Sequence, residues 1–333
     1  MPDRVKWGVI GSGGIARRRT IPEGLTTASN ATLVSVFDIN QAANQEVARQ
    51  FGAIAAGSIP ELLSAGVDAV YIATPVHLHC ALALECFLAG KHVLCEKPLG
   101  MDVAEARTMV DAAAQAGLQF GTAFMMRLHS QHQAALKLVQ EGKLGKLVYA
   151  RAQLSCWYPP IEGAWRQRLA LGGGGSLIDM GNHCIDLLEM FLGPVERVSC
   201  FVNRSVQDYE SEDSAVAMLR FASGATATVD AFFCIPDASS RNVLELYGSR
   251  GSILAENTIG QAAQGRMQAI LETGGAIDIA PAPVNTYRAE IEEFSQAILE
   301  RRPSRLSGEA GLHSQKVMAA CYQSARGGHA VTV

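Results

Sequence analysis

The sequence predicts an α/β fold, with an N-terminal doubly wound parallel sheet followed by a C-terminal α+β domain. Three observations favour this class. Short apolar runs alternate with helical stretches in the N-terminal third, a glycine-rich loop follows the first apolar run, and longer β-rich runs succeed one another after residue 123. The 333 residues are enough for two domains of ordinary size, which we place at 1–122 and 123–333.

Composition and charge restrict the classes of function. The chain is 48% hydrophobic and 18% charged, has a formal net charge of −4 and disperses its Lys and Arg, so we expect a globular protein that binds no nucleic acid. No apolar run approaches the roughly 18 residues of a membrane span, and no signal peptide precedes the first predicted strand. The eight cysteines are scattered without a C-x-x-C pair, which is typical of reduced thiols in a cytoplasmic protein.

The N-terminal domain is predicted from alternating strands and helices, which wind into a parallel sheet through right-handed crossovers. Apolar runs predict strands over 5–10, 32–37, 53–55, 69–73, 92–95 and 119–122. The stretches between them predict helices over 14–27, 41–50, 59–63, 78–89 and 103–116. Asp102 can cap the start of the last helix, and Gly117 can end it.

The C-terminal domain is predicted from longer β-rich runs. These runs predict strands over 147–156, 195–203, 215–221, 225–233, 242–247 and 252–255. Helical patterns predict helices over 131–141, 176–191, 287–300 and 309–326. Strands in succession with short connections are typical of an antiparallel sheet, so this part is interpreted as a separate α+β domain. Segment 257–286 carries no clear pattern of either kind.

A dinucleotide loop is predicted at 11–16, where GSGGIA matches G-x-G-x-x-G/A directly after a strand and at the start of a helix. Its glycines permit a close approach of a pyrophosphate, and the helix N-terminus offers N–H groups. The next strand ends at Asp38, where a carboxylate can bind the adenosine ribose but repels a 2′-phosphate. NAD is therefore favoured. NADP is possible if an arginine at 17–19 reaches the adenosine end, although a solvated helix face explains this cluster more simply. The residues expected to bind the cofactor are Gly11, Gly13, Gly14, Ile15 and Asp38.

Two further strands end in polar residues at the edge where an open α/β sheet binds its ligands. Pro75 turns the chain after one of them, so we expect Thr74 and His79 near the nicotinamide, although a structural role suits His79 equally well. The next strand runs into Glu96-Lys97-Pro98. A surface ion pair is the alternative for this dipeptide, but its position favours a lysine that handles a carbonyl or hydroxyl oxygen while a hydride moves. We add Thr74, Pro75, His79, Glu96 and Lys97 to the expected cofactor site.

A second candidate site lies where a run of four glycines meets the predicted helix 176–191. Ser176 can cap this helix, and Asp179, His183 and Asp186 follow at i, i+4 and i+7 on one face. Three explanations for these polar groups stay open: a metal-ligand set, a hydrogen-bond network that holds the glycine loop, or acid–base chemistry in which His183 exchanges a proton with a reacting hydroxyl. The dinucleotide loop upstream favours the third.

Together these motifs resemble the glucose–fructose oxidoreductase / inositol dehydrogenase family (Gfo/Idh/MocA) over nearly the whole chain. The likeness depends on GSGGIA, Asp38, ATPVHLH, AGKHVLCEKPL and GGGGSLIDMGNHCIDL. In that family the lysine of the E-K-P motif and a D-x-x-x-H pair form the catalytic set, which implies Lys97, Asp179 and His183. Either Lys97 or His183 can carry the proton of the reacting hydroxyl. The resemblance further implies a Rossmann domain, a second domain whose large open sheet mediates homodimers or homotetramers, and NAD(P)-dependent hydride transfer on sugars, cyclitols and related polyols.

The implied substrate is a small sugar or polyol, and no resident metal is expected. Besides Asp179 and His183, the residues expected to bind the substrate are Arg127, Trp157, Trp165 and Arg166, with Asp186 nearby. The two tryptophans fit a hydrophobic core equally well. The alternatives are a non-catalytic NAD(P)-binding sensor of the same fold, a dihydrodiol-type dehydrogenase and a metal-dependent enzyme.

Overall fold

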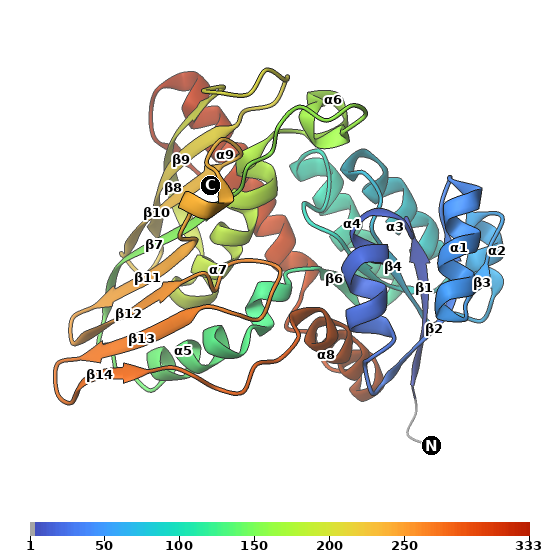
Figure 1. The fold of residues 1–333 in the computed structure, drawn as a ribbon, viewed down its shortest axis with the longest axis horizontal. Helices are drawn as coiled ribbons and strands as arrows, with labels where there is room; N and C mark the ends of the chain where they lie inside the picture. Colours follow the sequence, from blue (N-terminus) through green and yellow to red (C-terminus); the bar gives the residue numbers. More distant parts are fainter. Residues whose placement is uncertain (1–3) are drawn as a thin grey trace. The chain divides into compact units, whose positions relative to one another are not determined.

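The computed structural model describes residues 4–333, and its contacts divide the chain into two compact units (Figure 1). The first unit consists of the chain up to Met125 together with Asn285–Leu312, and the second of Met126–Val284 and His313–Val333. Each unit contains a sheet of its own and is described by itself. Among the described residues, every helix is too short or too polar to cross a membrane.

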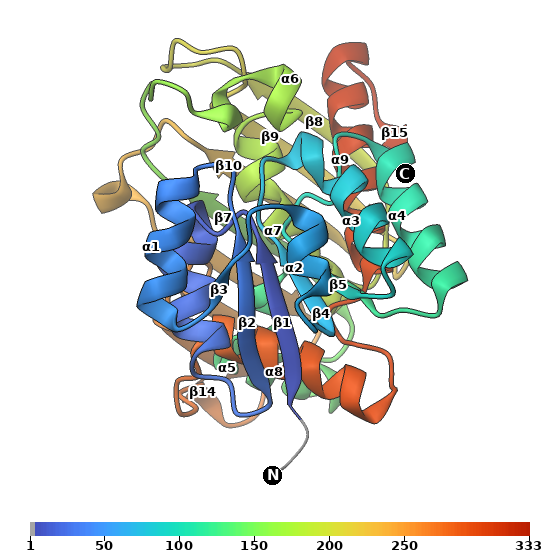
Figure 2. The same ribbon diagram turned by 90° about the vertical axis from the view of Figure 1, so that its right-hand side faces the viewer.

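The first unit is built on a six-stranded sheet in the order β3-β2-β1-β4-β5-β6, all of whose pairs are parallel. β1 and β2 run side by side in it (Figure 2). The strands are β1 (Val5–Ile10), β2 (Ala31–Phe37), β3 (Ile54–Ala55), β4 (Ala69–Ile72), β5 (His92–Cys95) and β6 (Phe120–Thr122). The predicted doubly wound parallel sheet is confirmed. Its strand order reverses between β1 and β4, and ligands of such sheets bind outside the carboxyl ends of the strands at this point.

Helices connect these strands as the sequence predicts. They are the π-helix η1 (Ala16–Leu25), α1 (Gln41–Phe51), α2 (Ile59–Ser64), the 3-10 helix η2 (Val76–Leu78), α3 (His79–Leu88) and α4 (Val103–Ala116). The expected ends of α4 are confirmed: the Asp102 side chain accepts a hydrogen bond from the Glu105 N–H, and Gly117 adopts the left-handed conformation that ends the helix.

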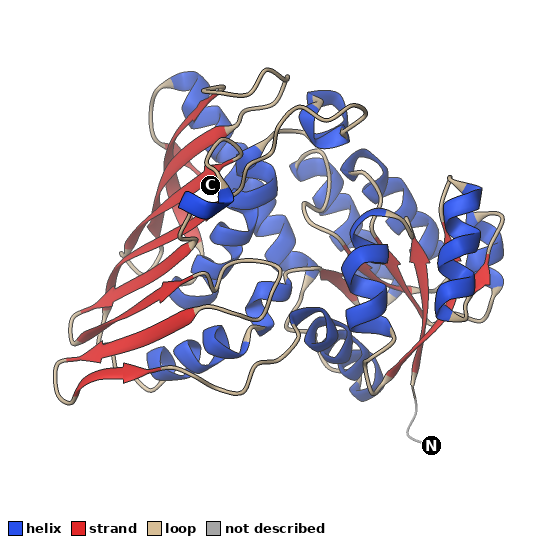
Figure 3. Ribbon diagram, viewed as in Figure 1, coloured by secondary structure: helices blue, strands red, loops and turns tan. Residues whose placement is uncertain are grey.

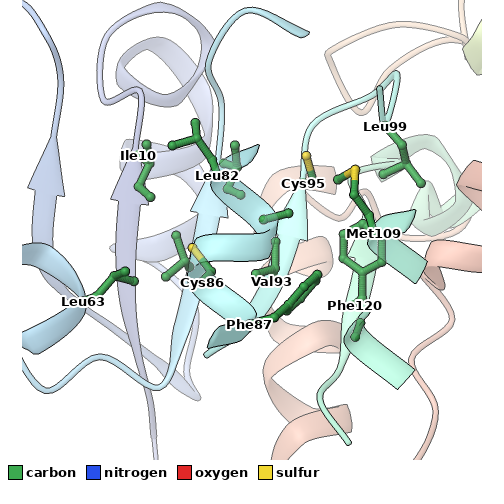
Figure 4. Packing of buried hydrophobic residues seen from close by; sticks show 14 of the residues in the cluster. Ile10, Leu63, Leu82, Cys86, Phe87, Val93, Cys95, Leu99, Met109 and Phe120 are labelled. Carbon is green, nitrogen blue, oxygen red and sulfur yellow. The ribbon is translucent and has the colours of Figure 1, made fainter. Parts of the chain in front are cut away.

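A hydrophobic cluster packs helices α3 and α4 against the sheet (Figure 4). Val93 and Cys95 of β5 are fully buried in it, and the rings of Phe87 and Phe120 meet edge to face with centroids 5.4 Å apart. Strands covered on both faces are apolar at nearly every position, which explains the continuous runs of β4 and β5. This packing fixes the strand ends from which the candidate site residues extend.

Helix α8 (Thr286–Glu300) belongs to the first unit, whereas the division at 122/123 assigned it to the second domain. It packs against η1 and against strands β1 and β2. The indole N–H of Trp7 donates a hydrogen bond of 3.0 Å to Ser295 Oγ inside this contact. The periodicity of an amphipathic helix shows which of its faces is buried but not which sheet it covers. The packing of α8 in the first unit was therefore not predicted.

The second unit is built on a nine-stranded sheet in the order β14-β13-β12-β11-β7-β10-β9-β8-β15. Its strands are β7 (Leu147–Ser155), β8 (Val195–Asn203), β9 (Ser214–Phe221), β10 (Thr226–Phe232), β11 (Val243–Gly248), β12 (Gly251–Glu256), β13 (Arg266–Leu271), β14 (Gly275–Asp278) and β15 (Val331–Thr332). The pair β7–β10 is parallel and the other pairs are antiparallel, so the predicted mostly antiparallel sheet is confirmed.

Helices of the second unit pack on one face of this sheet (Figure 3). They include α5 (Ser130–Gln140), the π-helix η5 (Leu177–Gly181), α7 (Asn182–Leu192) and most of α9 (Gly308–Gly327). Shorter turns are η3 (Met125–Leu128), η4 (Trp165–Gln167), α6 (Leu169–Gly172) and η6 (Asp237–Ser239). The strands alternate buried and exposed residues, as expected of a sheet with one covered face. On the uncovered face, the Phe201 and Met218 side chains are 73% and 62% exposed.

Candidate active site

The glycine-rich loop follows β1, requires glycine at position 11 and is tight at Gly13. Gly11 has a φ of +85°, and a Cβ there would lie 2.8 Å from the backbone of Ala73. Gly13 donates its N–H to Asp38 Oδ2 at 2.9 Å, and a Cβ on Gly13 would lie 3.2 Å from the same oxygen. Gly14 has open space around its Cα. The loop and the Asp38 carboxylate therefore meet, as the dinucleotide motif predicts.

These residues fit a dinucleotide. The backbone can approach a pyrophosphate at the glycines, and Asp38, which directly follows β2, offers carboxylate oxygens for ribose hydroxyls. All three neighbouring arginines have partners of their own. Arg17 pairs with Glu46 at 2.6 Å, and Arg19 pairs with Glu23 at 2.8 Å. Arg18 donates to the Gly14 carbonyl at 3.3 Å. These contacts favour the interpretation of the arginine cluster as a helix face over a 2′-phosphate site.

His79 is buried beneath the loops that follow β4 and β5. Its Nδ1 lies 3.0 Å from the Pro98 carbonyl oxygen and its Nε2 lies 2.9 Å from the Thr74 carbonyl oxygen. Burial lowers the pKa of His79, while the two carbonyls oppose this shift. The ring therefore holds the two strand-end loops together. This environment favours a positioning role over the predicted direct contact with the cofactor.

Glu96 directly follows β5, and its side chain faces the interior of the first unit. Glu96 Oε1 accepts the Tyr71 hydroxyl proton at 2.5 Å, and Oε2 accepts the backbone N–H of Lys97 at 3.2 Å. Tyr71 is fully buried in β4, and its hydroxyl accepts a hydrogen bond from Thr20 Oγ1. These two hydrogen bonds thus fix the Glu96 side chain beside Lys97. Lys97 is itself half-buried. This anchoring favours a positioning role for Glu96.

A second carboxyl group, which the sequence did not indicate, belongs to the same cluster. Glu290 of α8 is 1% exposed, and its Oε1 has no hydrogen-bond partner among the described residues. Burial raises the pKa of Glu290 well above its ordinary value, and the nearby Glu96 raises it further. Tyr287, one turn earlier on α8, lies under the Arg19 guanidinium at 5.2 Å. Both effects favour the protonated form of the Glu290 carboxyl group.

Replacing Glu290 with Gln is expected to flatten the pH dependence of stability. Because the pKa of Glu290 is raised in the fold, the folded chain keeps a proton that the unfolded chain loses above pH 4.5. The free energy of unfolding of the natural protein therefore falls as pH rises, by about 1.4 kcal/mol for each pH unit over which the proton is kept. Denaturant unfolding between pH 5 and pH 8 measures this slope. The exposed Glu272→Gln is the control, and equal slopes for all three proteins would contradict the assignment.

The run of glycines before η5 is explained by two close approaches. A Cβ on Gly175 would lie 1.9 Å from the Glu212 carbonyl oxygen, and a Cβ on Gly174 would lie 2.0 Å from the Tyr322 hydroxyl. The expected cap by Ser176 is wrong: its side chain makes no capping hydrogen bond, and its backbone is already helical. The carboxylate of Glu212 takes this role, because it accepts hydrogen bonds from the N–H groups of Gly175 and Leu177 at 2.8 and 3.0 Å.

Asp179 lies in the π-helix η5 and forms an ion pair with Arg166. Arg166 Nε is 3.3 Å from Asp179 Oδ1, and the guanidinium stacks on the Trp165 ring at 4.2 Å from its centroid. Trp157 is 44% exposed, and its backbone N–H donates to Asp237. The structure therefore brings Trp165, Arg166 and Asp179 together within the second unit.

His183 and Asp186 lie on α7, one turn apart, and both are buried. The expected single helix 176–191 is divided, since its first part is a π-helix. Asp186 forms a two-pronged ion pair with Arg127, whose Nε and Nη2 lie 2.7–2.9 Å from the carboxylate oxygens. Burial raises the pKa of Asp186 to about 6 even though Arg127 opposes the shift. Arg127 is thus held by Asp186, which favours a positioning role over the predicted substrate contact.

The metal interpretation finds no support in this arrangement. Among residues 4–333, no three His, Cys, Asp or Glu side chains are grouped so that they could hold a metal ion. Asp179 and Asp186 each have an arginine partner instead. The second interpretation was a hydrogen-bond network that holds the glycine loop. Such hydrogen bonds come from the Glu212 carboxylate, which was not among the three residues predicted for the network.

Comparisons with known proteins find two family models that match the chain. A model of the oxidoreductase family with an NAD-binding Rossmann fold matches residues 5–124, and a model of the GFO/IDH/MocA C-terminal domain matches residues 132–254. The 1,5-anhydro-D-fructose reductase of Ensifer adhaerens is 31% identical over 332 residues, which are 98% of each chain. The chain belongs to the Gfo/Idh/MocA family.

This Gfo/Idh/MocA protein is an NAD-binding oxidoreductase. Another relative, the myo-inositol 2-dehydrogenase of Thermotoga maritima, is 27% identical over 91% of each chain. The crystal structure of the aldose-aldose oxidoreductase from Caulobacter crescentus, complexed with glycerol, matches with a TM-score of 0.89 at 26% identity. That match covers 99% of this chain and 100% of the other. These relatives are dehydrogenases and reductases of sugars and cyclitols.

Proposed function

We propose that this protein interconverts a secondary alcohol and a ketone of a sugar, cyclitol or related polyol, with Lys97, Asp179 and His183 as its catalytic residues. The observation that carries the proposal is the full-length likeness to a sugar reductase in a chain that keeps the lysine at the end of β5 and the Asp179–His183 pair. The anchoring of Glu96 beside Lys97 and the ion pair of Asp179 with Arg166 support it.

The proposed mechanism assigns one task to each residue. Bound NAD supplies the acceptor for the hydride that leaves the alcohol carbon. His183 takes up the hydroxyl proton in oxidation and returns it in reduction. Lys97 donates a hydrogen bond to the reacting oxygen and stabilises the negative charge that develops there. Asp179 orients the substrate and His183, while Arg166, Trp157 and Trp165 bind the rest of the substrate.

The proposed cofactor site is formed by the glycine loop and two strand ends. The positive φ of Gly11 and the open space at Gly14 support binding of a pyrophosphate along the loop. Asp38 binds the adenosine ribose, and Lys97 follows the strand β5. The complete proposed set is Gly11, Gly13, Gly14, Ile15, Asp38, Thr74, Pro75 and Lys97, with His79 and Glu96 positioning the strand-end loops.

Replacing Asp38 with Ala is expected to weaken NADH binding by about 10-fold or more, because one good hydrogen bond to a charged group contributes about 1.5–3 kcal/mol. NADPH binding is expected to weaken less or to improve, since the carboxylate that repels the 2′-phosphate is gone. Fluorescence titration with both reduced cofactors measures the two dissociation constants. Glu46→Ala is the control, because it removes a carboxylate that pairs with Arg17 and has no predicted ribose contact. An unchanged ratio of NADH to NADPH affinity would contradict the role of Asp38.

The function is tested by a substrate screen. Purified protein is mixed with NAD or NADP and a panel of cyclitols, free aldoses, glycosides and dihydrodiols, while the absorbance of the reduced nicotinamide is followed. Ketosugars with NADH or NADPH test the reverse direction. We expect turnover with members of the sugar or cyclitol classes. Tight cofactor binding without turnover on any substrate would favour the alternative of a non-catalytic sensor.

Oligomerisation and location are proposed separately. Phe201 and Met218 expose their side chains on the uncovered face of the nine-stranded sheet, which supports a homodimer or homotetramer through this face. Light scattering tests this, and a monomeric mass would contradict it.

The eight cysteines are all free, which supports a reducing, cytoplasmic compartment. Cell fractionation tests the location.

A further inference from the structure

Glu212 is the group around which the start of the Asp179–His183 helix is built. It precedes strand β9 and is 7% exposed. Its Oε2 accepts the Gly175 N–H at 2.8 Å, and its Oε1 accepts the Leu177 N–H at 3.0 Å and the Tyr322 hydroxyl at 2.8 Å. The backbone carbonyl of Glu212 accepts the Ser176 N–H at 3.0 Å. One residue therefore binds three successive N–H groups at the start of the helix.

The backbone at Gly175 passes directly beside the backbone of Glu212. A Cβ on Gly175 would lie 1.9 Å from the Glu212 carbonyl oxygen, so the backbone of the glycine run can reach Glu212 only without side chains. N–H groups at a helix start need acceptors, and negative charge there is favourable. Ser176 supplies no side-chain cap, so the acceptors come from Glu212.

Short hydrogen bonds lead from this carboxylate to the proposed catalytic residues. Gly175, whose N–H binds Glu212, accepts the Asp179 N–H on its carbonyl at 3.0 Å. Leu177, whose N–H also binds Glu212, accepts the N–H of Asn182, which directly precedes His183. Movement of Gly175 would therefore disturb Asp179, and movement of Leu177 would disturb the residue before His183.

We propose that Glu212 is a positioning residue of the enzyme: its buried carboxylate, braced by Tyr322, fixes the start of the π-helix and thereby the places of Asp179 and His183. The inference rests on the proposed function of those two residues. Gly174 and Gly175 of the glycine run then allow the backbone to approach Tyr322 and Glu212 closely.

Glu212→Gln replaces one acceptor oxygen with an NH₂ group that faces backbone N–H donors. We expect kcat to fall by about 10–100-fold, a loss typical of residues that orient catalytic groups. The dissociation constant of NADH should stay within about twofold of the natural value, because the dinucleotide loop belongs to the other unit. Glu212→Asp keeps the charge on a shorter side chain and should restore part of kcat. The control is Glu210→Gln, an exposed carboxylate two residues away, which should keep kcat.

A second readout does not require turnover. Hydrogen exchange of the peptide that covers 175–183 should quicken in Glu212→Gln but stay unchanged in Glu210→Gln. If exchange is faster in Glu212→Gln but neither the natural protein nor the variants show activity, the role of Glu212 in holding the helix start is supported while the proposed function fails. A folded Glu212→Gln protein with natural kcat or natural exchange would overturn the inference.

Tyr322→Phe keeps the test valid if Glu212→Gln does not fold. It removes one hydroxyl that donates to Glu212 Oε1 and leaves the carboxylate in place. We then expect kcat to fall by a few-fold, with unchanged NADH binding and faster exchange at 175–183. Natural values for both kcat and exchange in Tyr322→Phe would overturn the inference.

Discussion

Replacing Lys97 with Ala is expected to lower kcat by about 10²–10³-fold, the usual cost of removing a hydrogen-bond donor that stabilises charge on a reacting oxygen. The half-buried Lys97 follows β5 at the ligand-binding edge of the parallel sheet, beside a Glu96 that Tyr71 anchors. Without the ammonium group, negative charge on the reacting oxygen loses its hydrogen-bond donor. NADH binding is expected to change little, because most of its contacts come from the glycine loop and Asp38.

His183→Ala is expected to lower kcat by about 10²–10⁴-fold, the usual contribution of a general acid or base. The double variant should lose less than the product of the two, because both residues are proposed to act on one oxygen. Lys137→Ala is the matched control for charge removal, since its side chain is 76% exposed on α5. Steady-state assays and NADH titration separate the outcomes. Turnover retained in both single variants would remove the acid–base assignment, whereas loss of NADH binding in Lys97→Ala would indicate a structural effect.

Replacing Arg127 with Met is expected to lower the free energy of unfolding by about 3–5 kcal/mol at pH 8, because it leaves a buried charge without its partner. The Asp186 side chain is 2% exposed and that of Arg127 is 18% exposed, so water replaces little of the lost interaction. Helix α7, which carries His183, would also lose the ion pair between Arg127 and Asp186, one turn from His183. Activity is therefore expected to fall together with stability.

The loss should depend on pH with a defined sign. The pKa of Asp186 in the fold is about 6, above its ordinary 3.8, so this group stabilises the folded chain less as pH rises from 3.8 to 6. Without Arg127 the pKa of Asp186 rises further. At a pH below this raised pKa the Asp186 carboxyl group becomes neutral and needs no charged partner. The variant should lose less stability at pH 5 than at pH 8. Arg241→Met, from an ion pair with side chains 76% and 53% exposed, should unfold like the natural protein. Equal losses at both pH values for Arg127→Met would contradict the account.

Local sequence patterns predicted most of the secondary structure. Strands Val5–Ile10, His92–Cys95 and Val195–Asn203 have the predicted bounds, because each is a continuous or alternating apolar run between turn residues. The ends of α4 at Asp102 and Gly117 follow from capping by neighbouring residues. The dinucleotide loop and Asp38 meet as predicted, since the Rossmann motif fixes their relation within one βαβ unit.

Features that depend on distant partners could not be predicted. The carboxylate that caps η5 comes from Glu212, which is 35 residues beyond Leu177 in the sequence. Glu290 reaches the Glu96 cluster on a helix whose sheet the periodicity did not identify. Strands β13 and β14 were missed in segment 257–286, where β14 is exposed at every position and so lacks an alternating pattern.

Transfer of deuterium from substrate to cofactor shows whether this protein moves a hydride between them. The polyol that reacts fastest in the screen is labelled with deuterium at its reacting carbon and incubated with NAD and the enzyme, and the reduced cofactor is analysed by mass spectrometry. We expect the reduced nicotinamide to carry the deuterium, and we expect Lys97→Ala and His183→Ala to form it far more slowly at saturating NAD. Reduced cofactor without the label, or labelled cofactor formed at the natural rate by both variants, would contradict it.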